Sequence, residues 1–236
     1  MLLCTLLLLV ESASSLTSAA LRLELSALRT SMERDDGKTV HSAAAARGVS
    51  VRDLVQRSIL ASRYKLALDA CGIGASTVCA GRGLFALRDV EAGELLTIYP
   101  ADALITFDPA RTKRGVMWAE HVPEGLRDAA KLADVWVEYE LAPYEKSETG
   151  YLYSIIGIPD LDGDAAYAGH FINDGAALVA EGAAALDRYR ADSASAANAD
   201  FEALEELHCG VVATRRIAEG EEILASYGAN YWESRL

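Results

Sequence analysis

The sequence predicts a mainly β domain with flanking helices, α+β overall, and two patterns carry this prediction. From about Gly72 onward, short apolar stretches with β character alternate with glycine-containing turns. Before that point, apolar residues recur instead at the spacing of one helical face. At 236 residues the chain is long enough for one domain with a substantial core and an appendage.

The composition is that of a soluble globular protein, with 51% hydrophobic and 24% charged residues. Its 22 lysines and arginines are outnumbered by 35 aspartates and glutamates, which gives a net charge of −13. Such acidity argues against direct binding of nucleic acid through its phosphates. It is compatible with attraction of a basic peptide, although a soluble acidic surface accounts for the charge by itself.

The cysteines stand apart in the sequence and form no Cys-x-x-Cys pair or Cys/His set with ligand spacing. A structural zinc is therefore not expected, and we predict no metal site. A disulfide framework is also unusual in a chain of this size, so we expect reduced thiols and an intracellular protein, nuclear or cytoplasmic. The four residues are Cys4, Cys71, Cys79 and Cys209.

Residues 1–48 are expected to form an appendage to the main domain. Its apolar start, "MLLCTLLLLV", is too short to span a bilayer, which takes roughly 18–20 residues. The run has the length of a signal-peptide core and small residues follow it, but no lysine or arginine precedes it. A targeting segment and an ordinary N-terminal helix both stay open, and we predict no membrane span.

A helical lead-in is expected over residues 49–71. Ser50 and Asp53 have the spacing of a capping box. We expect this helix to pack on the main domain, with a coiled or partner-binding helix as the alternative. The apolar residues that share roughly one face of it are Val51, Val55, Ile59 and Leu66.

Residues 72–232 are expected to form the main domain. An alanine-rich stretch around residues 178–200 is interpreted as an inserted helix or loop, because long surface insertions cost little closure entropy. Apolar residues alternate in "VWVEYEL", as a half-buried strand requires, at Val135, Val137, Tyr139 and Leu141. The candidate strands are "STVCA", "LFAL", "ELLTIY", "VWVEYEL", "YLYSII", "CGVVAT" and "EEILASY".

The stretch "GRGLFA" at Gly81 to Ala86 formally matches the G-x-G-x-x-A dinucleotide fingerprint. That fingerprint works only where a helix opens at the loop, with its N-terminus facing the pyrophosphate. Here another turn follows almost at once, in "RDVEAGE", and leaves no room for a crossover helix. A tight glycine turn between two strands remains, either a plain hairpin or a place where a ligand approaches the backbone closely.

The stretch "AGHFINDGA" gathers three polar side chains, His170, Asn173 and Asp174, around an apolar pair. A metal is not expected here, because asparagine is a poor ligand and no second histidine stands at helical spacing. Asn173 is either an Asx-turn residue or an amide that donates and accepts hydrogen bonds at a fixed place. Motifs of serine hydrolases, P-loop nucleotidases and zinc proteases do not occur in the sequence.

Two segments have nearly the same build, "LRDVEAGELLTIYP" and "RRIAEGEEILASYG". Each begins with a short apolar stretch, which is followed by a turn rich in Glu, Ala and Gly. A Gly-Glu pair and a strand-like run come next, and the run contains a tyrosine near its end. These tyrosines are Tyr99 and Tyr227. Considered singly, each is more typical of a strand aromatic in a core than of a catalytic group.

Taken in order, "GRGLFALRDVEAGELLTIYPADAL", "GHFINDGA" and "CGVVATRRIAEGEEILASYGANYW" resemble the SET-domain family of protein lysine methyltransferases. The resemblance runs from roughly Gly72 to Trp232. It implies a β-clip fold of small sheets, with a C-terminal pseudoknot where the last segment threads past the Asn173 segment. It also implies S-adenosyl-L-methionine as methyl donor and a lysine-bearing protein or peptide, histone or non-histone, as substrate.

The resemblance further implies a cofactor site. Gly81, Arg82 and Gly83 match the Gly-x-Gly turn whose backbone holds the methionine part of the donor. Asn173 matches the first member of the family's Asn-His pair, which contacts the donor. Asp174 stands in place of the His, and that second member acts largely through its backbone toward the adenine.

For the catalytic centre, Tyr227 matches the family's catalytic tyrosine, and Tyr99 falls where many members place another tyrosine of the lysine channel. Tyr231 and Trp232 are expected to close the channel or to cover the adenine. Asn198 is a looser match to a second family asparagine.

These residue types suit transfer of a methyl group to a lysine, whose amine must first lose its proton. A channel beside a cationic sulfonium favours the neutral amine through desolvation and like charge. Phenols orient that amine without adding charge, because they stay neutral at pH 7. We therefore predict a protein-lysine N-methyltransferase. The alternative is a catalytically inactive SET-like binding or scaffold module, motivated by Asp174 and the insertion.

Overall fold

The structure, a computed structural model, describes residues 66, 68–107, 114–119, 121–128, 131, 136–144, 152–205 and 208–236. The predicted appendage (residues 1–48) lies outside these residues, as does most of the predicted lead-in helix (49–71). The proposed domain boundaries therefore stay predictions. Within the described residues, no helix is long and apolar enough to cross a membrane.

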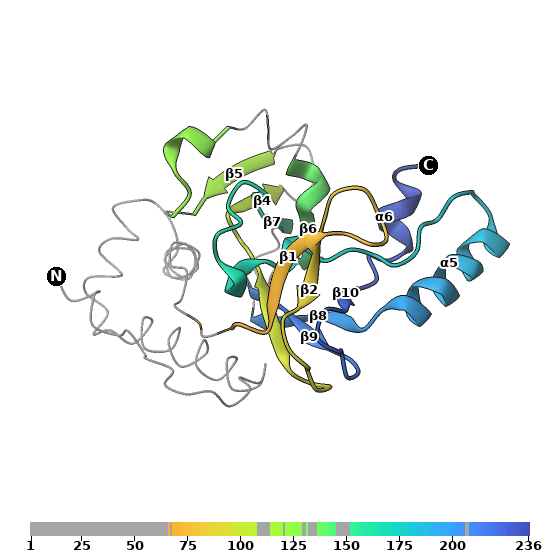
Figure 1. Cartoon of the computed structure of the whole chain (residues 1–236). Helices are drawn as coiled ribbons and strands as arrows, with labels where there is room; N and C mark the ends of the chain where they lie inside the picture. The colour runs from red at the N-terminus through yellow and green to blue at the C-terminus, as the bar shows by residue number, and fades with distance from the viewer. Residues whose placement is uncertain are drawn as a thin grey trace.

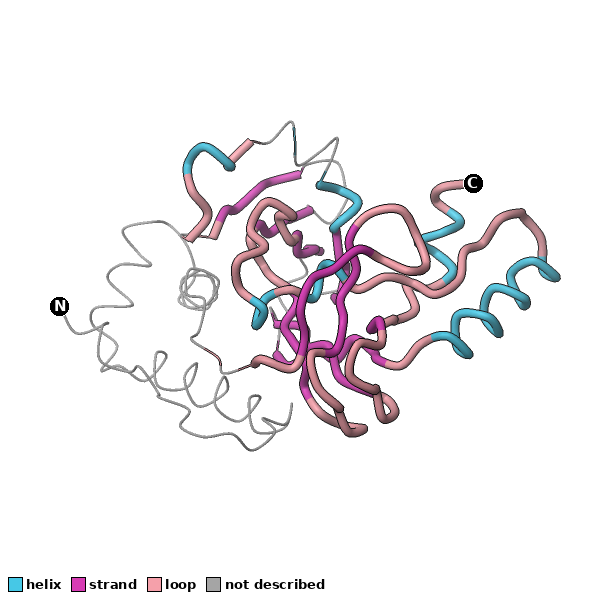
Figure 2. Tube along the Cα trace, in the orientation of Figure 1, coloured by secondary structure: helices cyan, strands magenta, loops and turns pink. Residues whose placement is uncertain are grey.

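Three small antiparallel sheets of short strands form the framework of the described chain (Figures 1 and 2). Their strand orders are β1-β2-β10, β3-β9-β8 and β5-β4-β7-β6. The predicted mainly β fold of small sheets is confirmed. The strands are β1 (Cys71–Ala75), β2 (Arg82–Ala86), β3 (Leu95–Tyr99), β4 (Ala103–Phe107), β5 (Arg114–Trp118), β6 (Glu140–Tyr144), β7 (Leu152–Ile156), β8 (Ala199–Glu205), β9 (His208–Ala213) and β10 (Glu222–Ile223).

Short helices connect and flank these sheets. The alanine-rich stretch contains α5 (Ala183–Ala196), which lies beside α6 (Ala229–Glu233) at one side of the molecule (Figure 1). In the described parts of the connections lie four 3₁₀ turns: η1 (Glu124–Leu126), η2 (Trp136–Tyr139), η3 (Ala165–Tyr167) and η4 (Gly169–Phe171).

The main hydrophobic core lies between the first two sheets and the η3–η4 segment, and a further buried cluster lies on the third sheet. Every residue of β3 and β9 is buried, because both strands are covered on two sides. Burial raises the pKa of the free thiols of Cys71 and Cys209 to about 12, so both stay protonated at neutral pH.

The two similar sequence segments face each other in the fold. We define the first arm as residues 83–100 and the second arm as residues 210–227. Their turns meet where Val90 N donates to Ile217 O at 2.9 Å and Ile217 N donates to Val90 O at 3.0 Å. Each arm thus completes the other arm's hydrogen bonding.

Corresponding residues of the two arms make corresponding contacts. Gly93 N donates to Ala213 O at 2.7 Å, and its counterpart Gly220 N donates to Ala86 O at 2.8 Å. Both turn glycines have positive φ, +86° and +80°, which glycine adopts without strain. The arms are therefore related by a local two-fold arrangement.

The prediction of a strand at "STVCA" is wrong, because residues 76–80 form a loop and the strand before them is β1. Most of "VWVEYEL" is also not a strand: residues 136–139 form η2, and β6 begins at Glu140. The alternating pattern would place Trp136 toward solvent, yet it is only 2% exposed and packs beside Trp118. Burial of this large ring overrides the period-two pattern.

Four strands were not predicted, namely β1, β4, β5 and β8. β8 follows α5 almost directly and pairs with β9, so the stretch predicted as insertion up to residue 200 already includes the start of a strand. The "EEILASY" strand is shorter than predicted, because only Glu222 and Ile223 pair with β2. After them the chain changes partner.

The new partner is the Asn173 segment. Leu224 forms a parallel bridge with Asn173, and Ala225 N donates to Asn173 O at 3.0 Å. The C-terminal segment therefore passes along a connection that precedes it in sequence, as the expected pseudoknot requires.

Candidate active site

The glycine turn before β2 has open space on one side and two polar side chains on the other. Gly81 has φ +118°, and nothing lies within 4 Å of the position that a Cβ would take there. A Cβ on Gly83 would instead lie 2.2 Å from Glu222 Oε1 and 3.2 Å from Asn173 Nδ2. Glycine is needed at Gly81 for its conformation and at Gly83 for the close approach of these side chains.

The Asn173 amide ties this turn to the second arm. Its Nδ2 donates to Arg82 O at 2.9 Å and to Glu222 Oε1 at 3.2 Å. The Asx-type hydrogen bond of this segment is made instead by Asp174, whose Oδ1 accepts from Ala176 N at 3.1 Å.

Glu222 was missed from the sequence. It is buried, and its carboxylate accepts hydrogen bonds from Ser76 Oγ at 2.7 Å and from Thr77 N at 2.6 Å. Burial acts to raise the pKa of this carboxyl, but its hydrogen bonds with Thr77, Ser76 and Asn173 outweigh burial and lower it. The available signal was an acidic residue at a core-facing strand position, where a carboxylate is unusual.

Tyr227 is held to the Asn173 segment at two points. Its hydroxyl donates to Ile172 O at 2.7 Å, and its backbone N–H donates to Asp174 Oδ2 at 3.0 Å. Burial, followed by the neighbouring Tyr231 and Asp174, raises the pKa of the phenol well above its usual value. The phenol is therefore neutral across the physiological range.

Tyr99 lies deeper, only 6% exposed, at the end of β3. Its hydroxyl donates to Tyr139 O at 2.6 Å, and its ring packs edge-on against His170. Burial raises the pKa of Tyr99 far above its usual value, and the nearby Tyr227 phenol adds to this shift. The fold therefore places Tyr227 near enough to Tyr99 to contribute to the raised pKa of the Tyr99 phenol.

The Arg82 side chain turns to another contact. Its guanidinium donates to Asp162 Oδ2 at 2.7 Å and to Pro159 O at 2.8 Å, and it stacks 4.3 Å from the Phe171 ring centroid. Only its backbone carbonyl takes part in the contact with Asn173. Arg82 therefore fastens the glycine turn to the loop at residues 159–162.

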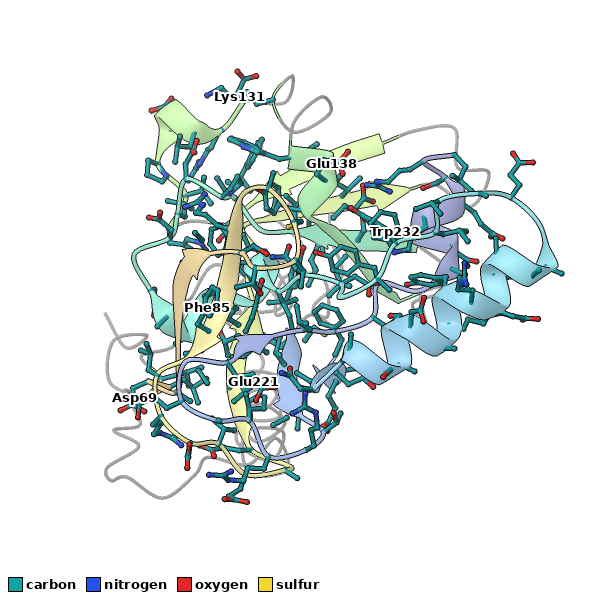
Figure 3. All side chains as sticks on the ribbon, turned by 45° about the vertical axis from the view of Figure 1, so that its right-hand side comes forward. Asp69, Phe85, Lys131, Glu138, Glu221 and Trp232 are labelled. Atoms are coloured by element: carbon teal, nitrogen blue, oxygen red, sulfur yellow. The ribbon has the colours of Figure 1, made fainter. Side chains whose placement is uncertain are left out.

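The C-terminal aromatics pack around Tyr227. The Trp232 ring lies nearly parallel to the Tyr227 ring, with centroids 6.2 Å apart, and Trp232 Nε1 donates to Asp174 Oδ2 at 3.1 Å. Arg235 stacks on Tyr231 and pairs with Glu138 at 2.8 Å, which fastens α6 to η2. Figure 3 labels both ends of this region, Glu138 and Trp232.

Asn198 supports the second arm from behind. It is 1% exposed, its Nδ2 donates to Glu222 O at 2.8 Å, and its Oδ1 accepts from Leu224 N at 2.8 Å. These contacts complete the backbone hydrogen bonding of β10. They do not reach the glycine turn, so Asn198 acts on the site through Glu222.

A family model of the SET domain matches residues 81–228, which include both arms and the Asn173 segment. The chain belongs to the SET-domain family. A search of curated protein sequences finds no match.

Two solved structures illustrate the similarity of this SET domain to others. A Plasmodium falciparum protein assigned as a histone methyltransferase is 19% identical, with a TM-score of 0.32 over 69% of this chain and 96% of that chain. The SET domain of ATXR5, in complex with histone H3 dimethylated on an arginine, is 14% identical, with a TM-score of 0.40 over 67% of this chain and 57% of that chain. The family assignment rests on the family model.

The SET domain thus brings most of the predicted site residues together. The Asn173 amide contacts the glycine turn at Arg82 O and lies beside Gly83, and Tyr227 is bonded to the residues on either side of Asn173. No group of three or more His, Cys, Asp or Glu side chains that could hold a metal occurs in the part of the chain that the structure describes. One cavity, of about 460 Å³, lies beside Tyr227 and is lined by Tyr189, Arg190, Ala194, Ser226, Tyr227, Gly228, Ala229 and Asn230.

Proposed function

We propose that this SET domain transfers a methyl group from S-adenosyl-L-methionine to the side-chain amine of a lysine in a protein. The observation that carries the proposal is the convergence of the Gly81–Gly83 turn, the Asn173 amide and the Tyr227 phenol on one place in the fold. A glycine turn with open space and accessible backbone suits a ligand that must approach closely.

The residues around the turn fit a cationic donor. The open side of Gly81 leaves room for the methionine part against the backbone. Asn173 supplies an amide, and the buried Glu222 supplies a negative charge bonded to that amide. The donor brings an activated methyl on a sulfonium, so the protein's task is to hold and align the two reactants.

The two tyrosines are suited to orient the acceptor amine. Each hydroxyl already gives its hydrogen to a main-chain carbonyl, Tyr227 to Ile172 and Tyr99 to Tyr139. The lone pairs of each phenol oxygen therefore remain to accept an N–H from the amine. Because burial keeps both phenols neutral, they orient the amine without attracting a proton to it.

The amine must arrive neutral, although a free lysine has a pKa of about 10.4. Desolvation near buried phenols and a cationic donor favours loss of its proton before attack. A donor held at the glycine turn would supply the methyl group to this neutral amine, with the electron pair of the broken carbon–sulfur bond left on sulfur. A net charge of −13 favours a basic substrate segment, such as a histone tail or another lysine-rich peptide.

The direct test is incubation of the full chain with radiolabelled donor, a panel of histones and a cell extract, followed by identification of the modified lysine by mass spectrometry. Isothermal titration calorimetry with the donor runs in parallel. Labelling together with donor binding supports the proposal. A chain that labels no protein and shows no donor binding by calorimetry would instead be the binding or scaffold module.

A further inference from the structure

Asp174, in the position where the family usually has histidine, is the centre of a buried hydrogen-bond network. It is 8% exposed, and its Oδ2 accepts from Tyr189 Oη at 2.6 Å, Tyr227 N at 3.0 Å and Trp232 Nε1 at 3.1 Å. Its Oδ1 accepts from Ser193 Oγ at 2.8 Å. Every one of these partners is a donor, so both carboxylate oxygens of Asp174 act as acceptors.

Helix α5 supplies two of these donors and little else to the core. Tyr189 and Ser193 are the only buried residues of the helix, and they stand four positions apart on one face. A helix normally docks through an apolar stripe. The buried residues of α5 instead carry hydroxyl groups, and both hydroxyl groups donate to the Asp174 carboxylate.

A glycine lets the helix approach this closely. A Cβ on Gly175, the residue after Asp174, would lie 2.4 Å from Ala196 Cβ and 3.2 Å from Leu224 Cδ1. The end of α5 therefore packs directly on the backbone beside the carboxylate. Any side chain at this position would push α5 away from Asp174.

The network continues from Asp174 to Tyr227. Tyr189 and Ser193 both reach Ser226 as well, at 3.3 Å and 2.9 Å, so α5 contacts the residue just before Tyr227. Around these contacts α5 is separated from residues 226–230 by the cavity of about 460 Å³. The hydrogen bonds to Asp174 and Ser226 are thus the bridge between the helix and the tyrosine.

We propose that α5 is a working part of the active centre, in which Tyr189 and Ser193 fix the Asp174 carboxylate and Asp174 positions Tyr227. The kinetic test of this inference rests on the proposed methyl transfer, whereas the hydrogen-exchange test at Tyr227 does not. Asp174, Tyr189 and Ser193 are positioning residues, because they act through Tyr227. In this SET domain the inserted helix and the Asp174 substitution form one unit: the carboxylate replaces the usual histidine, and the helix supplies its donors.

The test compares Tyr189→Phe and Ser193→Ala, which remove one hydroxyl each, with Asp192→Asn on the exposed side of the same helix. Asp174→Asn makes the same chemical change at a buried position that Asp192→Asn makes at an exposed one, so Asp192→Asn is its matched control. We expect kcat to fall between about 10- and 100-fold in the three network variants, with KM for donor and peptide within about twofold. Asp192→Asn is expected to retain wild-type kinetics.

A double-mutant cycle tests whether the residues act as one unit. Once Asp174→Asn is present, Tyr189→Phe should cost little further turnover, because the partner of its hydroxyl is already altered. Full additivity of the two losses would overturn the positioning role. The positioning role would also be overturned if Asp192→Asn lost as much turnover as the network variants.

A measurement that needs no activity separates this inference from the proposed function. Amide hydrogen exchange at Tyr227, followed by NMR, reports its N–H bond to Asp174. Exchange should rise at least about tenfold in Tyr189→Phe, Ser193→Ala and Asp174→Asn and stay unchanged in Asp192→Asn. If the wild-type chain methylates nothing, raised exchange still supports the positioning of Tyr227 by α5. Unchanged exchange in Tyr189→Phe and Ser193→Ala overturns it, whatever the activity.

Discussion

The two arms of this SET domain are nearly alike at their turns and different at their ends. In each arm an arginine, a glycine and a glutamate occupy corresponding positions and make the same contacts, Arg88 with Glu94 and Arg215 with Glu221. Beyond the turn, the first arm continues as β3 and ends at the buried Tyr99. The second arm leaves its sheet after β10 and carries Tyr227 onto the Asn173 segment.

The difference shows what a local sequence can and cannot decide. Both turns close because glycine allows positive φ and the glutamate side chain accepts the backbone N–H three residues before it, from Glu91 in one arm and Ala218 in the other. The length of the following strand depends on its partner. β3 pairs with β9 from Leu95 to Tyr99, whereas β10 of the second arm pairs with β2 through two residues only.

The largest difference between the arms should appear when each tyrosine loses its hydroxyl. Tyr227→Phe is expected to lower kcat by roughly 100-fold or more while donor binding is retained. Tyr99→Phe should lower kcat by about tenfold at most, and its main effect should be a loss of roughly 0.5–1.5 kcal/mol of stability, because the Tyr139 carbonyl loses the Tyr99 hydroxyl and keeps only the Gly157 N–H, at 3.3 Å. Steady-state kinetics and urea unfolding measure both, and a Tyr227→Phe enzyme with full turnover would contradict the assignment.

The second comparison uses the glycines that open the two arms. Gly83→Ala would place a Cβ against Glu222 and Asn173, so we expect calorimetry to detect no donor binding. Gly210→Ala would place a Cβ 2.7 Å from Leu95 Cδ1. Its expected effect is overpacking that costs about 1–3 kcal/mol of stability, with donor binding preserved. Equal loss of donor binding in both variants would show that the glycine turn has no special role.

The third comparison concerns the position after each Gly-Glu pair, which is Leu95 in the first arm and Glu222 in the second. The folded-state pKa of Glu222 is lowered, so its contribution to stability is full above the unfolded pKa of about 4.3 and is lost as pH falls through the folded pKa. Glu222→Gln should cost roughly 1–3 kcal/mol at pH 7, and the difference from wild type should shrink below about pH 4. Urea unfolding between pH 3 and about 7 tests this, with the exposed Glu91→Gln as control. A difference independent of pH would contradict it.

The smallest effects are expected from the paired arginines of the two turns. Both arginines are about half exposed, but Glu94 is 8% exposed whereas Glu221 is 34% exposed. Arg215→Ala should therefore cost less than about 1 kcal/mol, and less at high salt. Arg88→Ala should cost somewhat more, up to about 2 kcal/mol, because the buried Glu94 carboxylate loses its charged partner. Equal losses in thermal or urea unfolding would show that the burial of Glu94 does not distinguish the turns.

Much of this site could be predicted from the sequence. Gly81, Gly83, Asn173 and Tyr227 carry chemical or conformational requirements that are visible in residue type and order, and the fold brings them together. Glu222 was missed because its partners, Ser76 and Thr77, lie far away in sequence and in a stretch predicted to be a strand.

The role of Asp174 could not be predicted for a related reason. In the sequence it is only a departure from the family pattern, and α5 is only an alanine-rich insertion. Their hydrogen bonds through Tyr189 and Ser193 join three segments, so no local pattern announces them. The same holds for Trp136, whose burial converts an alternating stretch into η2.

The sequence by itself determined the fold class, the two turns and the order of the family's motifs, because glycine conformation and apolar periodicity act over a few neighbouring residues. Only the tertiary structure decided where each arm ends, which carboxylates are buried and how α5 reaches Tyr227. Those features depend on which distant donors meet each buried acceptor, and a buried polar group is stable only where such a partner is supplied.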